Sequence, residues 1–169
     1  AILKEVLNRG IKPDVCAGLS LGEYAAIAAA NAMSLEDLFE IIRLRGKYMQ
    51  EAYPVGGAMM AVIGLEADVV EKVCDSIDGI VSIANDNCPG QIVLSGEENA
   101  VKAAGEALTE AGARRCIPLN VSGPFHSKLL SKASEQLEEA LKDKNILHRH
   151  CNSSRKKRIS RRVPLRQEP

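Results

Sequence analysis

Apolar residues recur with the period of a helix over most of the first 56 positions. This spacing predicts a short helix at the start of the chain, a helix from Glu23 to about Ala30 and a long helix after Ser34. Between the first two helices, a strand is predicted at 13–17. Ser34, with an aspartate three residues later, is a helix-start signal, and the Pro-Val-Gly-Gly run at 54–57 ends the long helix. This order of elements is typical of part of an α/β domain.

Short apolar runs alternate with helical patterns in residues 57–119. Four strands are predicted, at 59–63, 80–84, 91–94 and 115–119. Helical spacing fills the first and third intervals, and turn residues at 85–90 fill the second. The resulting order, βαββαβ, is that of a ferredoxin-like fold built from two split βαβ units. A loop and a helical pattern follow, and the periodicity stops at about Asn145.

The composition excludes several classes of protein. The chain has 169 residues, of which 46% are hydrophobic, so it can bury a core and is not globally disordered. No apolar run approaches the ~18–20 residues that cross a bilayer, and no signal peptide opens the chain, so we expect a cytoplasmic protein without a membrane partner. The five cysteines form no C-x-x-C pair, which argues against a disulfide scaffold and against a metal site.

The formal net charge of zero is a sum of two unlike segments. Residues 1–144 hold 14 basic and 21 acidic residues, whereas residues 145–169 hold 8 basic residues and 1 acidic residue. We predict that residues 145–169 are a basic tail that is disordered or translated out of frame, and a solvated basic arm is the alternative. Nucleic-acid binding is not expected, because the basic run has no interleaved aromatic residues.

The main chemical signal is Gly-Leu-Ser-Leu-Gly at 18–22, between the predicted strand and the following helix. In a G-x-S-x-G turn the glycines allow a sharp bend of the backbone and leave the serine exposed. The amide of Leu21, at the start of the helix, would then point to where an oxyanion forms. Ser20 is therefore a candidate nucleophile, and a glycine-rich turn with an incidental serine is the alternative.

A serine nucleophile needs a base, and His126 is the one histidine within residues 1–144. It lies on a loop just before a helical pattern, a place from which catalytic side chains are easily presented. Arg45 lies in the middle of the long predicted helix on an apolar face, where a guanidinium is costly to bury unless it meets an anion. The alternatives are a surface or capping histidine, and an arginine whose methylenes pack while its head reaches water.

Together these residues resemble one family, the malonyl-CoA:acyl carrier protein transacylases of bacterial fatty acid synthesis. Four stretches carry the resemblance, in family order and at family spacing, and they are residues 17–24, 43–52, 87–96 and 121–127. The resemblance implies an α/β-hydrolase-like main domain with a parallel sheet, formed here by residues 1–56 and 120–144. It also implies a ferredoxin-like subdomain inserted at 57–119.

The resemblance assigns a role to each candidate residue. Ser20 would be the nucleophile, His126 its base, and Arg45 the ligand of the malonyl carboxylate. The backbone N–H of Leu21 would be one donor of an oxyanion hole. Leu19 occupies a position that is commonly histidine in the family, which replaces one polar contact near the acyl group by an apolar one.

The implied reaction moves a malonyl group from CoA to the phosphopantetheine thiol of acyl carrier protein through a malonyl-serine intermediate, without a cofactor. Acyl carrier protein and malonyl-CoA are the expected partners, and a monomer is expected. The family has further regions before the first and after the last resembling stretch, so we expect impaired activity of this chain. The alternatives are a serine hydrolase or esterase with the same elbow, an acyltransferase domain of a polyketide synthase, and an inactive chain that binds carrier protein.

Overall fold

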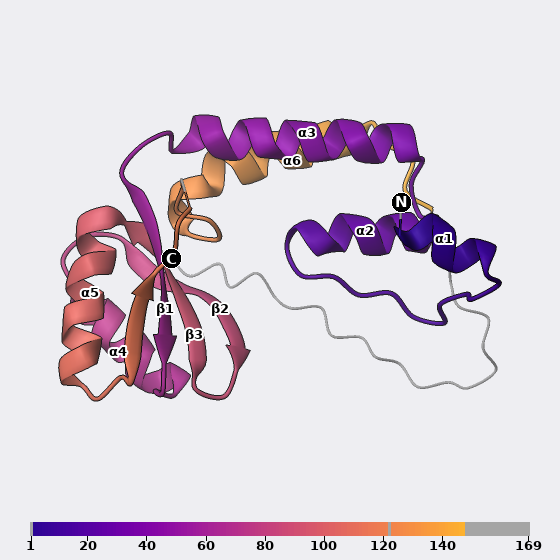
Figure 1. The fold of residues 1–169 in the computed structure, drawn as a ribbon. Helices are drawn as coiled ribbons and strands as arrows, with labels where there is room; N and C mark the ends of the chain where they lie inside the picture. The colour runs from indigo at the N-terminus through magenta and orange to yellow at the C-terminus, as the bar shows by residue number, and fades with distance from the viewer. Residues whose placement is uncertain (1, 122, 148–169) are drawn as a thin grey trace.

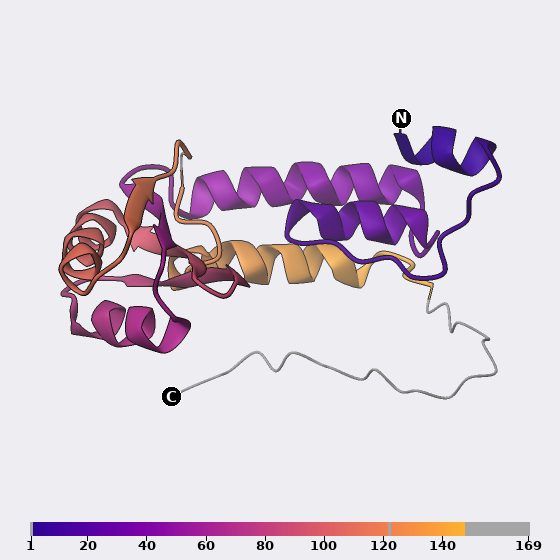
Figure 2. The same ribbon diagram turned by 60° about the horizontal axis from the view of Figure 1, so that its bottom comes forward.

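The structure, a computed structural model, describes residues 2–121 and 123–147 (Figure 1). Its described part is a mixed α/β arrangement, in which a layer of helices leads into a four-stranded sheet covered by two further helices (Figures 1 and 2). The elements in chain order are α1 (Ile2–Asn8), α2 (Leu21–Ala29), α3 (Leu35–Ala52), β1 (Gly57–Ile63), α4 (Ala67–Ser76), β2 (Val81–Cys88), β3 (Gln91–Glu97), α5 (Glu98–Glu110), β4 (Arg115–Pro118), the 3-10 turn η1 (Lys128–Leu130) and α6 (Ser131–Lys142).

The sheet has the strand order β2-β3-β1-β4, and every neighbouring pair is antiparallel. The two central strands, β1 and β3, are apart in sequence and pair along their whole length, from Gly57 opposite Glu97 to Ile63 opposite Gln91. The predicted order of strands and helices in residues 57–119 is therefore confirmed. The order of strands in space follows from the two crossovers through α4 and α5.

Helices α4 and α5 pack on one face of this sheet (Figure 1). Alternate residues of β1 and β3 face the helices, since side chains along a strand point to opposite faces. Val62 and Leu94 have no solvent-exposed surface, and they pack with Val70 of α4 and Leu108 of α5. This cluster is the main hydrophobic core among the described residues.

The helical layer contains α3, which packs against both α2 and α6 (Figure 2). Helix α3 begins as predicted, because the Ser34 hydroxyl accepts a hydrogen bond from the backbone N–H of Asp37 at 3.1 Å. The same end of α3 is tied to the residues after α6 by Lys144, whose ammonium pairs with Asp37 at 2.9 Å and with Glu40. The loop before α6 contacts the sheet at Gly57, where a Cβ would overlap the ring of Pro124.

Two predicted features of the fold are wrong. Residues 13–17 form no strand, because no backbone hydrogen bond joins them to another described segment. Among the described residues the strands all belong to the antiparallel sheet, so residues 1–56 and 120–144 form no parallel sheet there. The predicted turn at 85–90 is also shorter, because β2 continues to Cys88 with register shifts that absorb the extra residues.

The predicted basic tail lies outside the described residues, except for residues 145–147. None of the helices in the described ranges combines the length and the apolar composition needed to cross a membrane.

Candidate active site

Ser20 lies at the sharp turn that leads into α2. Its backbone has φ 53° and ψ −113°, a conformation that side-chain-bearing residues rarely adopt and that costs about 1–3 kcal/mol. The turn is tight because the backbone at Gly18 passes directly beside that of Gly22, where a Cβ at Gly18 would overlap the carbonyl group. The surrounding structure therefore holds the Ser20 hydroxyl in a strained and defined position, although no regular strand precedes it.

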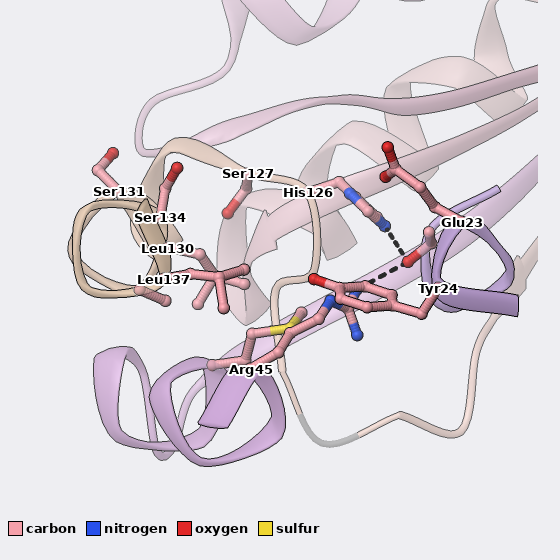
Figure 3. A pocket seen from close by; sticks show the side chains of 12 residues that line it. Glu23, Tyr24, Arg45, His126, Ser127, Leu130, Ser131, Ser134 and Leu137 are labelled. Carbon is pink, nitrogen blue, oxygen red and sulfur yellow. Dashed lines mark hydrogen bonds between the residues drawn. The ribbon is translucent and has the colours of Figure 1, made fainter. Parts of the chain in front are cut away.

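His126 meets this hydroxyl from a segment 106 residues further along the chain. The distance from Nε2 of His126 to Oγ of Ser20 is 2.9 Å (Figure 3). His126 also has a left-handed backbone, with φ 63°. The next residue fixes the loop, because the Ser127 hydroxyl donates to the Pro124 carbonyl at 2.8 Å and accepts from the Leu129 N–H at 3.3 Å.

Arg45 reaches the same hydroxyl from α3. Its Nη2 donates a hydrogen bond to Oγ of Ser20 at 2.9 Å. Its guanidinium carbon also lies 5.8 Å from the centre of the Tyr24 ring, within the range of a cation–π contact. Arg45 is half-buried, and among the described residues no carboxylate lies within ion-pair distance of it.

The protonation states of the site are consistent with a nucleophile and a base. Burial lowers the pKa of His126 below the ordinary histidine value, and the nearby Arg45 cation lowers it further. A neutral His126 can accept the Ser20 proton through Nε2, while Oγ of Ser20 accepts from Arg45. The arrangement can remove a proton from the hydroxyl and stabilise the negative charge that develops on oxygen.

The two remaining predicted residues flank the nucleophile. Leu21 is the first residue of α2, where backbone N–H groups have no partner within the helix and can donate to an anion. Leu19 is 70% exposed and lines a cavity together with Ser20. The structure thus brings Ser20, His126 and Arg45 together through contacts at the hydroxyl, and Leu19 and Leu21 adjoin Ser20 along the chain.

Two cavities meet at Ser20, Arg45 and His126, which line both. One, of about 610 Å³, extends along α6 and includes Tyr24, Leu130 and Leu137 (Figure 3); its polar wall includes Glu23, Ser127, Ser131 and Ser134. The other, of about 430 Å³, extends to the sheet face opposite α4 and α5, where Met59, Asn85 and Asn87 line it. A substrate that reacts at Ser20 therefore has room on two sides.

The sequence interpretation missed some of these lining residues. The sequence predicts a turn at 85–90, whereas the structure places Asn85 and Asn87 in β2 beside the site. Tyr24 lies four residues after Ser20 on a predicted helix, so the helical spacing alone would have placed it on the side of the nucleophile. No group of three or more possible metal ligands gathers within the described ranges.

Comparisons with known proteins identify the family of the chain. The family model described as "Acyl transferase domain" matches residues 2–167, a range that includes most of the basic segment. Malonyl CoA-acyl carrier protein transacylases from Bacillus subtilis (strain 168) and Staphylococcus aureus (strain COL) are 48% and 45% identical to the chain. The first match covers 83% of this chain and 46% of the relative, and the second covers 75% and 42%. The chain therefore spans about half the length of these curated relatives.

Solved structures that superpose on the chain are named as a malonyltransferase and a malonyl-transacylase. An acyl carrier protein S-malonyltransferase from Vibrio cholerae superposes with a TM-score of 0.81 at 40% identity, covering 86% of this chain and 49% of that one. A malonyl-transacylase in complex with a type II PKS acyl-carrier protein gives a TM-score of 0.83 at 39% identity, covering 86% and 48%. The resemblance inferred from the four sequence stretches is confirmed, and the chain belongs to the acyl transferase domain family.

Proposed function

We propose that the protein containing this chain transfers a malonyl group from CoA to the phosphopantetheine thiol of acyl carrier protein. The observation that supports the proposal most is the position of the Ser20 hydroxyl, 2.9 Å from both Nε2 of His126 and Nη2 of Arg45. Most serine hydrolases need only the contact between the serine and the histidine. A cation at the nucleophile suits an acyl group that carries its own carboxylate.

The first half of the reaction forms a malonyl-serine ester. Oγ of Ser20 attacks the thioester carbonyl of malonyl-CoA while Nε2 of His126 takes the hydroxyl proton. The carbonyl oxygen gains negative charge, which the backbone N–H of Leu21 would stabilise. The C–S bond then breaks, and the proton held by His126 passes to the CoA sulfur as the thiol leaves.

The second half reverses this sequence with a different thiol. The phosphopantetheine thiol of acyl carrier protein gives its proton to His126 and attacks the ester carbonyl. The bond between that carbon and Oγ of Ser20 breaks, and His126 returns the proton to Oγ. The proposed reaction uses no cofactor held by this chain, and the phosphopantetheine is carried by the partner.

Arg45 would give the reaction its preference for malonyl. Nη2 contacts Ser20 in the described structure, and the other N–H groups of the guanidinium make no hydrogen bond to a described residue. A malonyl carboxylate offers two oxygens to such a fork, whereas acetyl offers none. Leu19 lines the cavity next to this position and would pack against the substrate as an apolar group.

The chain would supply parts of two structural units. We propose that residues 1–56 and 120–144 belong to an α/β-hydrolase-like catalytic domain, and that 57–119 form a ferredoxin-like subdomain. The strand order β2-β3-β1-β4 with both helices on one face supports the second assignment. We further propose that residues 145–169 form a basic tail, that the protein is a monomer, and that it works in the cytoplasm.

A transfer assay tests the function. The chain is incubated with radiolabelled malonyl-CoA and holo acyl carrier protein, and label on the carrier is separated from free malonate. We expect label on the carrier with the native chain and none with Ser20→Ala. Free malonate without labelled carrier would instead favour a serine hydrolase, and absence of both products would indicate an inactive chain that at most binds its partner.

A second comparison tests the role of Arg45. Arg45→Ala should lower malonyl transfer about 10- to 100-fold, the range expected for the loss of hydrogen bonds to a charged group. Acetyl transfer should change much less, because acetyl has no carboxylate. An unchanged ratio of malonyl to acetyl transfer would remove Arg45 from the acyl site.

A further inference from the structure

Tyr24 lies against Arg45, the proposed ligand of the substrate carboxylate, and takes no part in the chemical steps described above. It lies one turn after Ser20 on α2 and is half-buried in the larger cavity. Figure 3 shows its ring lying against the Arg45 side chain. The distance from Cζ of Arg45 to the ring centre is 5.8 Å, close enough for the negative face of the ring to attract the cation.

The Arg45 head needs such a contact because little else holds it. Arginine side chains have several rotatable bonds, and about 2 kcal/mol of rotamer entropy opposes a fixed position. Among the described residues, the guanidinium makes one side-chain hydrogen bond, to Ser20, and has no carboxylate partner. The Ser20 contact cannot persist unchanged through the reaction, because Oγ of Ser20 becomes part of an ester.

The chemical type of the contact also matters. A carboxylate beside Arg45 would fix the guanidinium but would occupy the donors that a substrate carboxylate needs. An aromatic face holds the cation while leaving the edge of the guanidinium free to donate hydrogen bonds. The ring therefore orients the charge without neutralising it.

We propose that Tyr24 is a positioning residue, whose ring holds Arg45 ready for the carboxylate of the acyl group. This inference rests on the proposed function, since it concerns the binding of a substrate carboxylate at Arg45. The ring is the part that acts, because the Tyr24 hydroxyl makes no side-chain hydrogen bond to a described residue. Phenylalanine at position 24 should therefore preserve the malonylation of Ser20, whereas leucine should not.

The test compares Tyr24→Phe with Tyr24→Leu in the complete chain. The rate of Ser20 malonylation is measured over a range of malonyl-CoA concentrations, and Ser20 labelling by a fluorophosphonate is measured in parallel. Tyr24→Leu should lower kcat/KM for malonylation about 5- to 30-fold, as expected for the loss of a partly desolvated cation–π contact. The loss should come mainly from weaker substrate binding. Tyr24→Phe should restore malonylation to within about two-fold of the native rate.

Fluorophosphonate labelling controls for damage to the nucleophile. The probe has no carboxylate, so its reaction requires Ser20 and His126 but not a positioned Arg45. At about pH 8, where a histidine is neutral, Tyr24→Leu should label within about two-fold of the native rate. An equal fall in labelling and malonylation would mean that leucine only disturbs the elbow, and would overturn the inference.

A double-mutant cycle gives the second readout. In an Arg45→Ala background, Tyr24→Leu should have no further effect on malonylation, because the ring would act only through Arg45. Independent losses in the two backgrounds would overturn the inference. So would native behaviour of Tyr24→Leu, or a Tyr24→Phe variant as impaired as Tyr24→Leu.

The outcomes separate this inference from the proposed function. If the native chain takes no malonyl group from malonyl-CoA, the proposed function fails and the inference with it. If malonylation occurs and depends on Arg45 but not on the Tyr24 ring, the inference alone fails.

Discussion

The two glycines of the Gly-Leu-Ser-Leu-Gly turn have different surroundings and predict different effects of alanine. A Cβ at Gly18 would lie closer than 3.0 Å to three backbone atoms, two of Gly22 and one of Glu23. A Cβ at Gly22 would meet no atom within 4 Å. Gly22→Ala is therefore a matched control for Gly18→Ala, because both change one glycine of the same motif by one methyl group.

The size of the effect follows from the overlap. The nearest atom, the Gly22 carbonyl oxygen, lies about 1 Å inside the 3.0 Å limit, and backbone atoms cannot rotate away as a side chain would. The turn must therefore open by about 1 Å, which moves Ser20 relative to His126. A misplacement of ~1 Å can cost about 10²-fold in rate, so we expect a loss of that order for Gly18→Ala. Gly22→Ala, inside α2, should stabilise the helix by about 0.5–1 kcal/mol.

The assay is the rate of fluorophosphonate labelling at Ser20, with circular dichroism and thermal unfolding as measures of folding. Gly18→Ala should keep the helical signal of the other elements and lose most of the labelling rate. Gly22→Ala should label at close to the native rate. Native labelling of Gly18→Ala, or equal damage by both substitutions, would refute the idea that the close backbone approach at Gly18 positions the nucleophile.

Three further predictions follow from the packing and the charges. Burial and Arg45 lower the pKa of His126, so the rate of Ser20 labelling should fall only at pH values below the ordinary histidine pKa of about 6.5. Arg45→Ala should move the midpoint of this pH profile upward, and an unmoved midpoint would contradict the effect of Arg45 on His126. Lys144→Met should lower the thermal unfolding temperature at neutral pH. The difference should vanish as the pH falls through the pKa of Asp37, which the Lys144 hydrogen bond holds below its usual value; a pH-independent difference in thermal melts would argue against the ion pair. Leu94→Ala, at a fully buried position, should cost about 2–5 kcal/mol in urea unfolding, and a smaller loss would mean that the core collapses around the site.

The sequence predicts most of the fold because its signals are local. Helix α3 begins where Ser34 caps it, and the antiparallel sheet has the predicted order of elements, since apolar periodicity and turn residues both act over a few positions. The strand expected at 13–17 depends instead on a partner strand. An apolar segment becomes a strand only through pairing, and the described residues offer it none.

The site was partly predictable for the same reason. The sharp turn at Ser20 is encoded by five consecutive residues, 18–22, and Ser20 has the strained backbone that this motif requires. The approach of His126 and Arg45 depends on packing between α2, α3 and the loop before α6, which no local pattern encodes. Their roles were expected from chemistry and family resemblance, and they remain predictions. The contact between Tyr24 and Arg45 likewise appears only once α2 lies against α3.

Acyl transfer to Ser20 is tested most directly by peptide mass spectrometry of the chain after brief exposure to malonyl-CoA. We predict one malonyl group, attached as an ester to Ser20, that disappears when holo acyl carrier protein is added. Ser20→Ala should carry no malonyl group, and His126→Ala should acquire it far more slowly. A chain that binds malonyl-CoA but never carries the group, or carries it on another residue, would contradict the central claim that Ser20 is the acyl-accepting nucleophile.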